Sequence, residues 1–272
     1  MKFDSNLAWK QASEAVTANR DVLFAIAGVF LLLPNLAFAL LFPQPEPPAG
    51  IKGKEALEFL INYWQPALPW LLLAGVFQAV GTLAMLTLFT DRTRPTVGEA
   101  LRQGVACLIP YFLSQILVGI GMGAVGAMVV GAAAATKSVG LIVLAVMLLL
   151  VGVVYVGIKT SLTSPVIAVE GERNPLAALK RSWELTRGNS LSIFLFYLLV
   201  GLAFGVVLIV AMLMIGALLA VMLGVGETAR MIATAISSLL SMVFTTYFVA
   251  IVAAIHRQLA GPSGERVSAT FD

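Results

Sequence analysis

The residue types that most often carry out chemistry are scarce in this sequence. It contains one histidine, His256, and one cysteine, Cys107. A structural zinc site needs several such ligands, and a disulfide needs two cysteines. No histidine lies near a serine or cysteine that could act as a nucleophile, and His256 begins a polar stretch that we interpret as solvated. We therefore expect a protein that is not an enzyme and that holds no metal and no cofactor.

A glycine motif, GMGAVG at 121–126, matches the GxGxxG fingerprint of dinucleotide-binding proteins. That fingerprint requires a preceding strand and an acidic residue about 20 positions later. Here the motif lies inside an apolar run, so we interpret its glycines as packing residues. Small residues four positions apart let helix backbones approach closely in lipid, whether the partner helix belongs to the same chain or to another. The candidates for such packing are Gly119, Gly123, Ala127, Gly131, Gly201 and Gly205.

Basic residues beside an aromatic ring are the remaining candidates, and they predict contact with anionic lipid headgroups or with a protein partner. Lys159 follows an apolar run, and the segment NPLAALKRSWELTRGN at 174–189 has the cap, first-turn proline and glycine stop of a short helix. We expect this helix to lie on the inner membrane surface. Its candidate contact residues are Lys180, Arg181, Trp183 and Arg187. Two simpler interpretations stay open. The Lys159 side chain would merely reach the membrane–water interface, and the other basic residues would merely keep this segment on the cytoplasmic side.

The composition identifies the environment of these residues. Hydrophobic residues make up 60% of the 272-residue chain and charged residues only 11%, against about 45–50% and 25% in soluble domains. A soluble protein of this size could not bury so much apolar surface. The sequence therefore predicts an integral membrane protein. Its net charge of +3 then reflects basic cytoplasmic loops rather than a nucleic-acid partner.

Uncharged apolar stretches long enough to cross a bilayer predict six transmembrane helices. They lie at 22–42, 67–90, 105–135, 139–158, 191–224 and 231–255. The third and fifth are longer than one crossing needs, which a tilt, a kink or an interfacial start would explain. We expect residues 1–255 to form a single six-span domain and residues 256–272 a flexible cytoplasmic tail. None of the 14 acidic residues falls inside these stretches, which disfavours an ion-coupled pump.

The distribution of basic residues predicts the orientation. Thirteen of the 17 lysines and arginines lie in the two termini and the even-numbered loops. Because cytoplasmic segments carry the excess of basic residues, both termini are expected inside. The odd-numbered loops, which include Lys137 and Arg230, are expected outside.

Three inner segments share one pattern, and each precedes a pair of spans. The clearest is the segment at 174–189. A capping box at 96–99 followed by ALRQG resembles it, because ALRQG aligns with ALKRS at 178–182. Near the start, VTANR at 16–20 aligns loosely with LTRGN at 185–189. The sequence therefore predicts three repeats of an interfacial helix plus a membrane hairpin, with chance similarity among apolar segments as the alternative.

The stretch at 155–189 resembles the signature of the glycerophosphoryl diester phosphodiesterase membrane-domain family, and it is similar to related bacterial six-span proteins. The matching positions are Lys159, Pro165, Glu170, Ala178, Leu179, Ser182, Leu185 and Gly188. Some members of that family carry a fused catalytic barrel. The six spans leave no room for such a barrel here, so the resemblance implies no catalytic activity. It implies a role in membrane or lipid homeostasis.

These observations favour a non-enzymatic protein of the bacterial cytoplasmic membrane. It would act in membrane or lipid homeostasis, or as a membrane scaffold, through its inner-face helices. Membrane lipids, a protein partner or a second copy of the chain are the expected contacts. The alternative is a passive channel or a lipid-translocating transporter, with a path between the repeats. A continuous cavity would favour that alternative, and a packed centre would favour the first interpretation.

Overall fold

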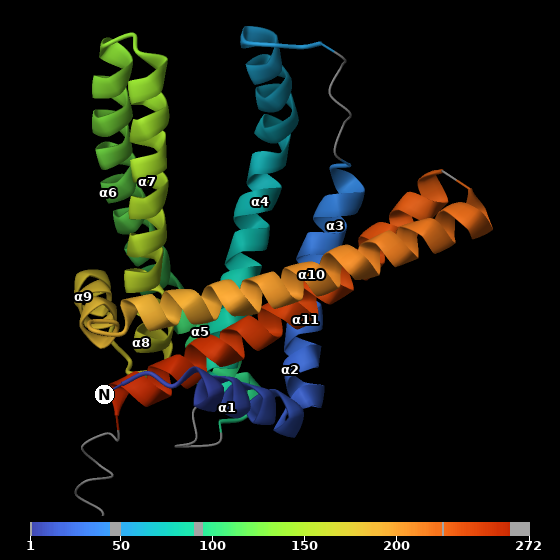
Figure 1. Ribbon diagram of the computed structural model, residues 1–272. Coiled ribbons are helices and arrows are strands. Elements are labelled where there is room, and N and C mark those ends of the chain that lie inside the picture. Colours follow the sequence, from blue (N-terminus) through green and yellow to red (C-terminus); the bar gives the residue numbers. More distant parts are fainter. Residues whose placement is uncertain (1, 44–49, 90–94, 225, 262–272) are drawn as a thin grey trace, which may run out of the picture.

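The computed structural model describes residues 2–43, 50–89, 95–224 and 226–261, and every regular element within these ranges is helical (Figure 1). Six of its helical segments are long and apolar enough to cross a membrane. This confirms the expectation of an all-α, multi-span protein. The last part of the predicted tail, 262–272, lies outside the described residues.

The first membrane hairpin follows a short amphipathic helix, α1 (Ser5–Ala18). Its first arm consists of α2 (Arg20–Ala27), a π-helical turn (Gly28–Leu32) and α3 (Leu33–Leu41). Its second arm is α4 (Lys54–Leu88). In the wide turn the Leu33 N–H donates to the carbonyl of Gly28. Such a bulge precedes the proline at position 34, which has no N–H to donate to the preceding turn.

The second and third hairpins follow short helices as well. Helix α5 (Val97–Ala106) precedes α6 (Leu108–Ala135) and α7 (Val139–Thr160). Four more helices follow among the described residues up to 261. They are α8 (Thr163–Val169), α9 (Pro175–Leu185), α10 (Ser190–Leu223) and α11 (Glu227–Ala260).

The three hairpins diverge from a common base. In Figure 1, α6 and α7 stand side by side, α3 and α4 stand apart from them, and α10 and α11 run crosswise as a pair. The most apolar stretch of α10 has no buried residue. Helices α6, α7 and α10 therefore present most of their apolar surface outward, as expected for helices whose solvent is lipid.

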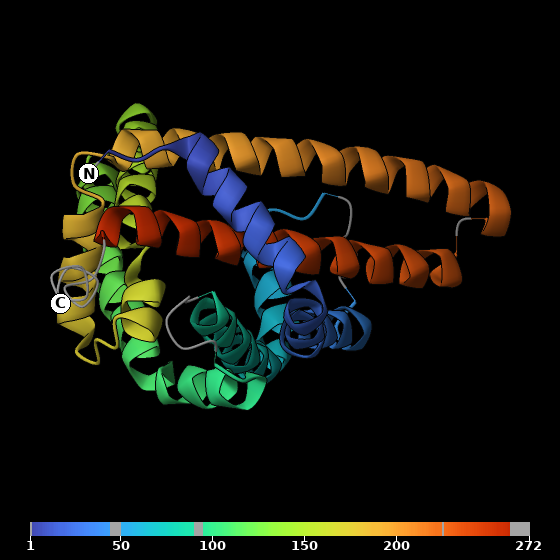
Figure 2. The same cartoon turned by 90° about the horizontal axis from the view of Figure 1, so that it is seen from below.

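The packed core lies at the base and surrounds the end of α11. Every residue from Val249 to His256 is buried, so this part of the helix is covered on all sides. Helices α1, α8 and α9 contact it, and Figure 2 shows α1 crossing α11 from below. Trp9 of α1 stacks on Tyr247 of α11 with ring centroids 6.2 Å apart.

Several predicted boundaries differ from those in the structure. The predicted start of the second span at residue 67 is wrong, because α4 begins at Lys54 and continues through Pro66 and Pro69. The predicted third span divides at Cys107, where α5 ends and α6 begins. Helix α11 extends to Ala260, five residues beyond the predicted end of the last span. The tail therefore does not begin at His256, because burial of that helix end in the core keeps it helical.

Polar contacts join the two arms of the first hairpin. The Gln78 side chain of α4 donates a hydrogen bond to the Asn35 side chain of α3 at 3.1 Å. The Tyr63 hydroxyl of α4 donates to the carbonyl of Phe42 at 2.8 Å. Such side-chain hydrogen bonds hold helices together where apolar contact alone gives little attraction in lipid.

Candidate headgroup-binding site

A buried lysine at the end of α7 is the most unusual charged group in the described part of the chain. Lys159 is only 4% exposed. Its ammonium nitrogen lies 5.4 Å from the ring centroid of Trp183 and 5.7 Å from that of Tyr155. No carboxylate among the described residues lies within ion-pair distance of it. The ammonium is thus stabilised by aromatic faces, and the described part of the chain supplies no neutralising anion.

The two rings that cover Lys159 come from two helices. Tyr155 lies one turn before Lys159 on α7, and Trp183 lies on α9. Their rings pack edge to face with centroids 5.7 Å apart. Trp183 is 41% exposed and Tyr155 is 49% exposed, so the rings form the outer layer of the site. An amphipathic indole at this position suits the headgroup region of a membrane.

A buried serine fixes α9 against the end of α7. The Ser182 hydroxyl donates to the carbonyl of Lys159 at 2.7 Å and accepts from the N–H of Leu162 at 3.2 Å. Ser182 is completely buried. It therefore satisfies backbone groups that the end of α7 leaves unpaired, and it sets the position of the neighbouring Trp183.

Arg187 provides a second positive charge close to Lys159. It follows α9 in a turn that Gly188 completes with a φ of +80°, a conformation that glycine adopts without strain. The charge of Arg187 acts on Lys159, and Arg187 itself is exposed. Two neighbouring positive charges are suited to a ligand that carries negative charge, such as a phosphate group.

The other predicted cations do not share this arrangement. Arg181 is paired with Glu170: its Nε lies 3.0 Å from one carboxylate oxygen, and its Nη2 donates to the other at 3.4 Å. Lys180 is exposed on α9 and belongs to neither cluster. The structure thus brings together Lys159, Trp183 and Arg187, and it assigns Arg181 to an internal ion pair.

Glu170 also contacts His256, and this contact corrects the interpretation of His256 as solvated. His256 is 4% exposed, and its Nε2 lies 2.9 Å from a carboxylate oxygen of Glu170. An ionised carboxylate only accepts hydrogen bonds, so Nε2 carries the proton. Burial alone would raise the pKa of Glu170. The hydrogen bonds and charges of His256 and Arg181 outweigh it and hold that pKa below its usual value.

The predicted packing residues do not pack against other helices of the same chain. A side chain built at Gly119, Gly123, Gly131, Gly201 or Gly205 would meet nothing within 4 Å, and Ala127 is exposed. The close helix contacts occur at other glycines. Gly81 faces Phe30, Gly104 faces the backbone of α4, and Gly126 faces Leu149. The predicted set is therefore available only to lipid or to another chain.

Six apolar spans, a helical base and a cationic site at one span end define a polytopic all-α membrane protein. The chain belongs to the family described as Domain of unknown function (DUF7847), whose model matches residues 8–259. No curated protein and no solved structure matches the chain.

Proposed function

We propose that this protein is a non-enzymatic membrane protein that binds the phosphate of anionic lipid headgroups at Lys159, Arg187 and Trp183. Its role would lie in membrane or lipid homeostasis, or in organising membrane components as a scaffold. The single observation that carries the proposal is the burial of Lys159 without a carboxylate. Burying an unpaired charge costs free energy, and a lipid phosphate would compensate that cost.

The size of the electrostatic attraction is consistent with a binding role. Each basic side chain near an anionic leaflet contributes about 1 kcal/mol. Because the spans already hold the protein in the membrane, these interactions are available for selecting a headgroup.

The predicted threefold repeat is part of this proposal, because it would explain how the inner helices are positioned. Helices α1, α5 and α9 each begin at a residue whose side chain caps the helix, namely Asp4, Thr96 and Asn174. Four residues after each cap stands a completely buried alanine, namely Ala8, Ala100 and Ala178. Eight residues after each cap stands another small buried residue, namely Ala12, Gly104 and Ser182.

The repeat has a direct test. If the three helices are equivalent, leucine at each of the three alanine positions fills the same kind of contact. Ala8→Leu, Ala100→Leu and Ala178→Leu should then lower the thermal unfolding temperature by similar amounts, since each overpacks a buried site. A neutral effect at one position only would contradict the repeat.

The membrane in which the protein resides, its orientation there and its relation to a second family are also proposals. We propose the bacterial cytoplasmic membrane, with both termini inside, because the basic residues concentrate at the base. A cysteine replacing Lys137, in a Cys107→Ser background, should react with an impermeant thiol reagent from outside, and one replacing Lys180 should not. The opposite pattern would reverse the orientation. The resemblance at 155–189 supports kinship with the glycerophosphoryl diester phosphodiesterase membrane-domain family.

The alternative function is a passive channel or a lipid-translocating transporter. The packed core around α11 supports the binding role, because it fills the base where the three hairpins meet. Ion flux through proteoliposomes that contain the purified protein would favour the alternative instead.

Lipid retention is the test of the proposed site. The wild type, Lys159→Gln and Lys180→Gln would be reconstituted in mixed phosphoglycerol and phosphocholine lipids, and the retained lipid quantified after detergent extraction. We expect Lys159→Gln to bind anionic lipid about tenfold more weakly, since a hydrogen bond to a charged group is worth about 1.5–3 kcal/mol. Lys180→Gln is the matched control and should behave as the wild type. Equal retention by all three folded proteins would contradict the proposal.

A further inference from the structure

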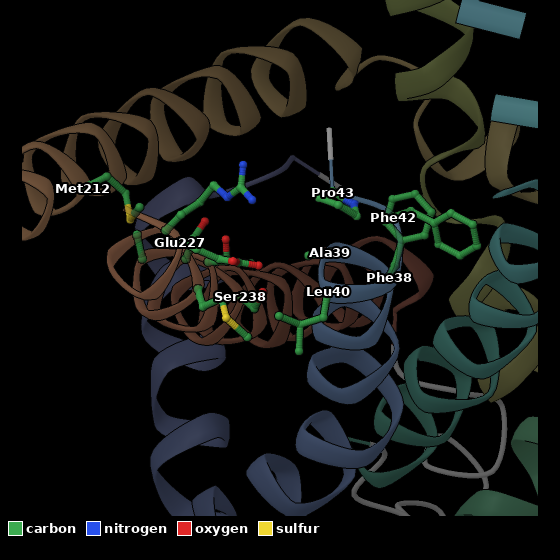
Figure 3. A pocket seen from close by; sticks show the side chains of 13 residues that line it. Phe38, Ala39, Leu40, Phe42, Pro43, Met212, Glu227 and Ser238 are labelled. Carbon is green, nitrogen blue, oxygen red and sulfur yellow. The ribbon is translucent and has the colours of Figure 1, made fainter. Parts of the chain in front are cut away.

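A cavity separate from the Lys159 site lies where the end of α3 meets the beginning of α11 (Figure 3). Its volume is about 570 Å³, within the roughly 300–1,000 Å³ typical of small-molecule sites. Phe38 and Phe42 form one wall, Met212 of α10 contributes to another, and α11 supplies the polar side. The cavity is therefore apolar on one side and polar on the other.

The polar side carries one charge of each sign. Glu227 is the first residue of α11, and Arg230 follows three positions later. Residues at this spacing share a helix face. Neither forms an ion pair with another described residue, nor do they pair with each other. The cavity thus offers a separate anionic and a separate cationic group.

Ser238 adds a hydrogen-bonding group to the polar side of the cavity. It lines the cavity, is only 9% exposed, and has no hydrogen-bond partner in the described part of the chain. By contrast, Thr245 and Thr246 further along α11 donate to backbone carbonyls one turn earlier. The Ser238 Oγ is open to the cavity and can donate a hydrogen bond to a ligand or water there.

The aromatic wall is held in place. Phe38 stacks on Phe42 with centroids 5.4 Å apart and on Trp64 of α4 at 6.3 Å. The hydrogen bond from Tyr63 to the Phe42 carbonyl fixes the end of α3 against α4. A preformed wall of this kind reduces the entropy lost when a ligand binds.

We infer that this cavity binds the headgroup of a zwitterionic phospholipid. Arg230 and Ser238 donate to the phosphodiester, and Glu227 pairs with the ammonium group. The start of the acyl chains lies against Phe38, Phe42 and Met212. The remainder of the chains continues along the exposed apolar surface of α10, where Ile209 and Leu213 are 62% and 69% exposed. This site is separate from the proposed anionic site and prefers a different headgroup.

Titration with short-chain phospholipids tests the inference, with Trp64 fluorescence and native mass spectrometry as readouts. The wild type should bind a phosphoethanolamine lipid saturably and more tightly than a phosphoglycerol lipid. Arg230→Gln should weaken binding of both about tenfold. Glu227→Gln should weaken the binding of the phosphoethanolamine lipid, because it removes the carboxylate that pairs with the ammonium group. The same change should strengthen the binding of the phosphoglycerol lipid, because it removes a carboxylate that repels the anionic lipid. Ser238→Leu should abolish binding of both by filling the cavity.

Two controls make the outcome decisive. Lys137→Gln removes the charge of an exposed basic residue in the α6–α7 turn and should leave the titration unchanged. The phosphoglycerol titrations are carried out in a Lys159→Gln background, which removes the proposed inner site. Lys159→Gln alone should leave the phosphoethanolamine titration unchanged, which separates the cavity from the inner site. Non-saturable binding, or the same lipid preference in the wild type and Glu227→Gln, would overturn the inference. Glu227 and Arg230 are exposed, so their replacement is compatible with folding.

Discussion

At the scale of single residues, the partners of each charge decide its role. Lys159 and Arg181 both follow from the sequence as candidates for a headgroup. Arg181 has a carboxylate partner in Glu170, whereas among the described residues Lys159 is contacted by aromatic faces and no carboxylate. A charge that is already neutralised gains little from a lipid phosphate, and an unpaired buried charge gains more. This difference is why the proposed site contains Lys159 and omits Arg181.

The contacts of Glu170 predict that stability depends on pH. The pKa of Glu170 is lower in the folded protein than in the unfolded chain. Its stabilising contribution is therefore complete above the ordinary glutamate pKa of about 4.3 and is lost as the pH falls through the lower folded value. Wild-type protein should lose thermal stability more steeply than Glu170→Gln when titrated from pH 7 to pH 3. If the unfolding temperatures of the wild type and Glu170→Gln fell in parallel across that range, the stabilising role of the ionised Glu170 would be contradicted.

At the scale of elements, the glycines that allow close helix packing are not the ones that recur at regular spacing in the sequence. A side chain at Gly81 of α4 would lie 2.5 Å from the Cβ of Phe30 in the π-helical turn, whereas one at Gly123 of α6 would meet nothing within 4 Å. The wide turn therefore packs Phe30 directly onto the backbone of α4.

This contrast provides a matched pair of substitutions. Gly81→Ala should destabilise the protein by about 1–3 kcal/mol, because it overpacks a close helix contact. Gly123→Ala should be neutral or slightly stabilising, since alanine favours helix more than glycine does. Unfolding in mixed micelles at increasing denaturant measures both. Equal destabilisation by the two substitutions would show that α6 packs closely on a partner absent from this arrangement.

At the scale of the whole molecule, the sequence predicts local features better than distant contacts. The six spans follow from apolar runs, because in lipid a single apolar segment can satisfy the hydrogen bonds of its own backbone only by forming a helix. The cap at Asn174 and the stop at Gly188 follow from residue chemistry in the same way. The ligand cluster near Lys159 is partly predictable, since Tyr155 lies one helical turn away and Trp183 lies on the next amphipathic helix.

The contacts that sequence reasoning missed join residues far apart in the chain. His256 and Glu170 are separated by 86 positions, and no periodic pattern relates them. The burial of His256 depends on how α11 enters the base, which is a property of packing among several helices. The division at Cys107 likewise reflects contacts: its thiol donates to the carbonyl of Ile167 on α8 at 3.6 Å. The sequence did indicate a close contact at Ser182, because this small residue aligns with Gly104, another small residue, in the earlier segment.

The central claim, that a lipid phosphate neutralises Lys159, has a direct measurement. Protein labelled with ¹⁵N at lysine side chains would be placed in phosphoglycerol bilayers, and the dipolar coupling between lysine Nζ and lipid ³¹P recorded by solid-state NMR. We predict one lysine signal with strong dephasing by phosphorus that persists at high salt and disappears in Lys159→Gln. High salt should remove contacts of exposed lysines, because screening weakens them most. A dephased signal that remains unchanged in Lys159→Gln, or no salt-resistant signal in the wild type, would contradict the account.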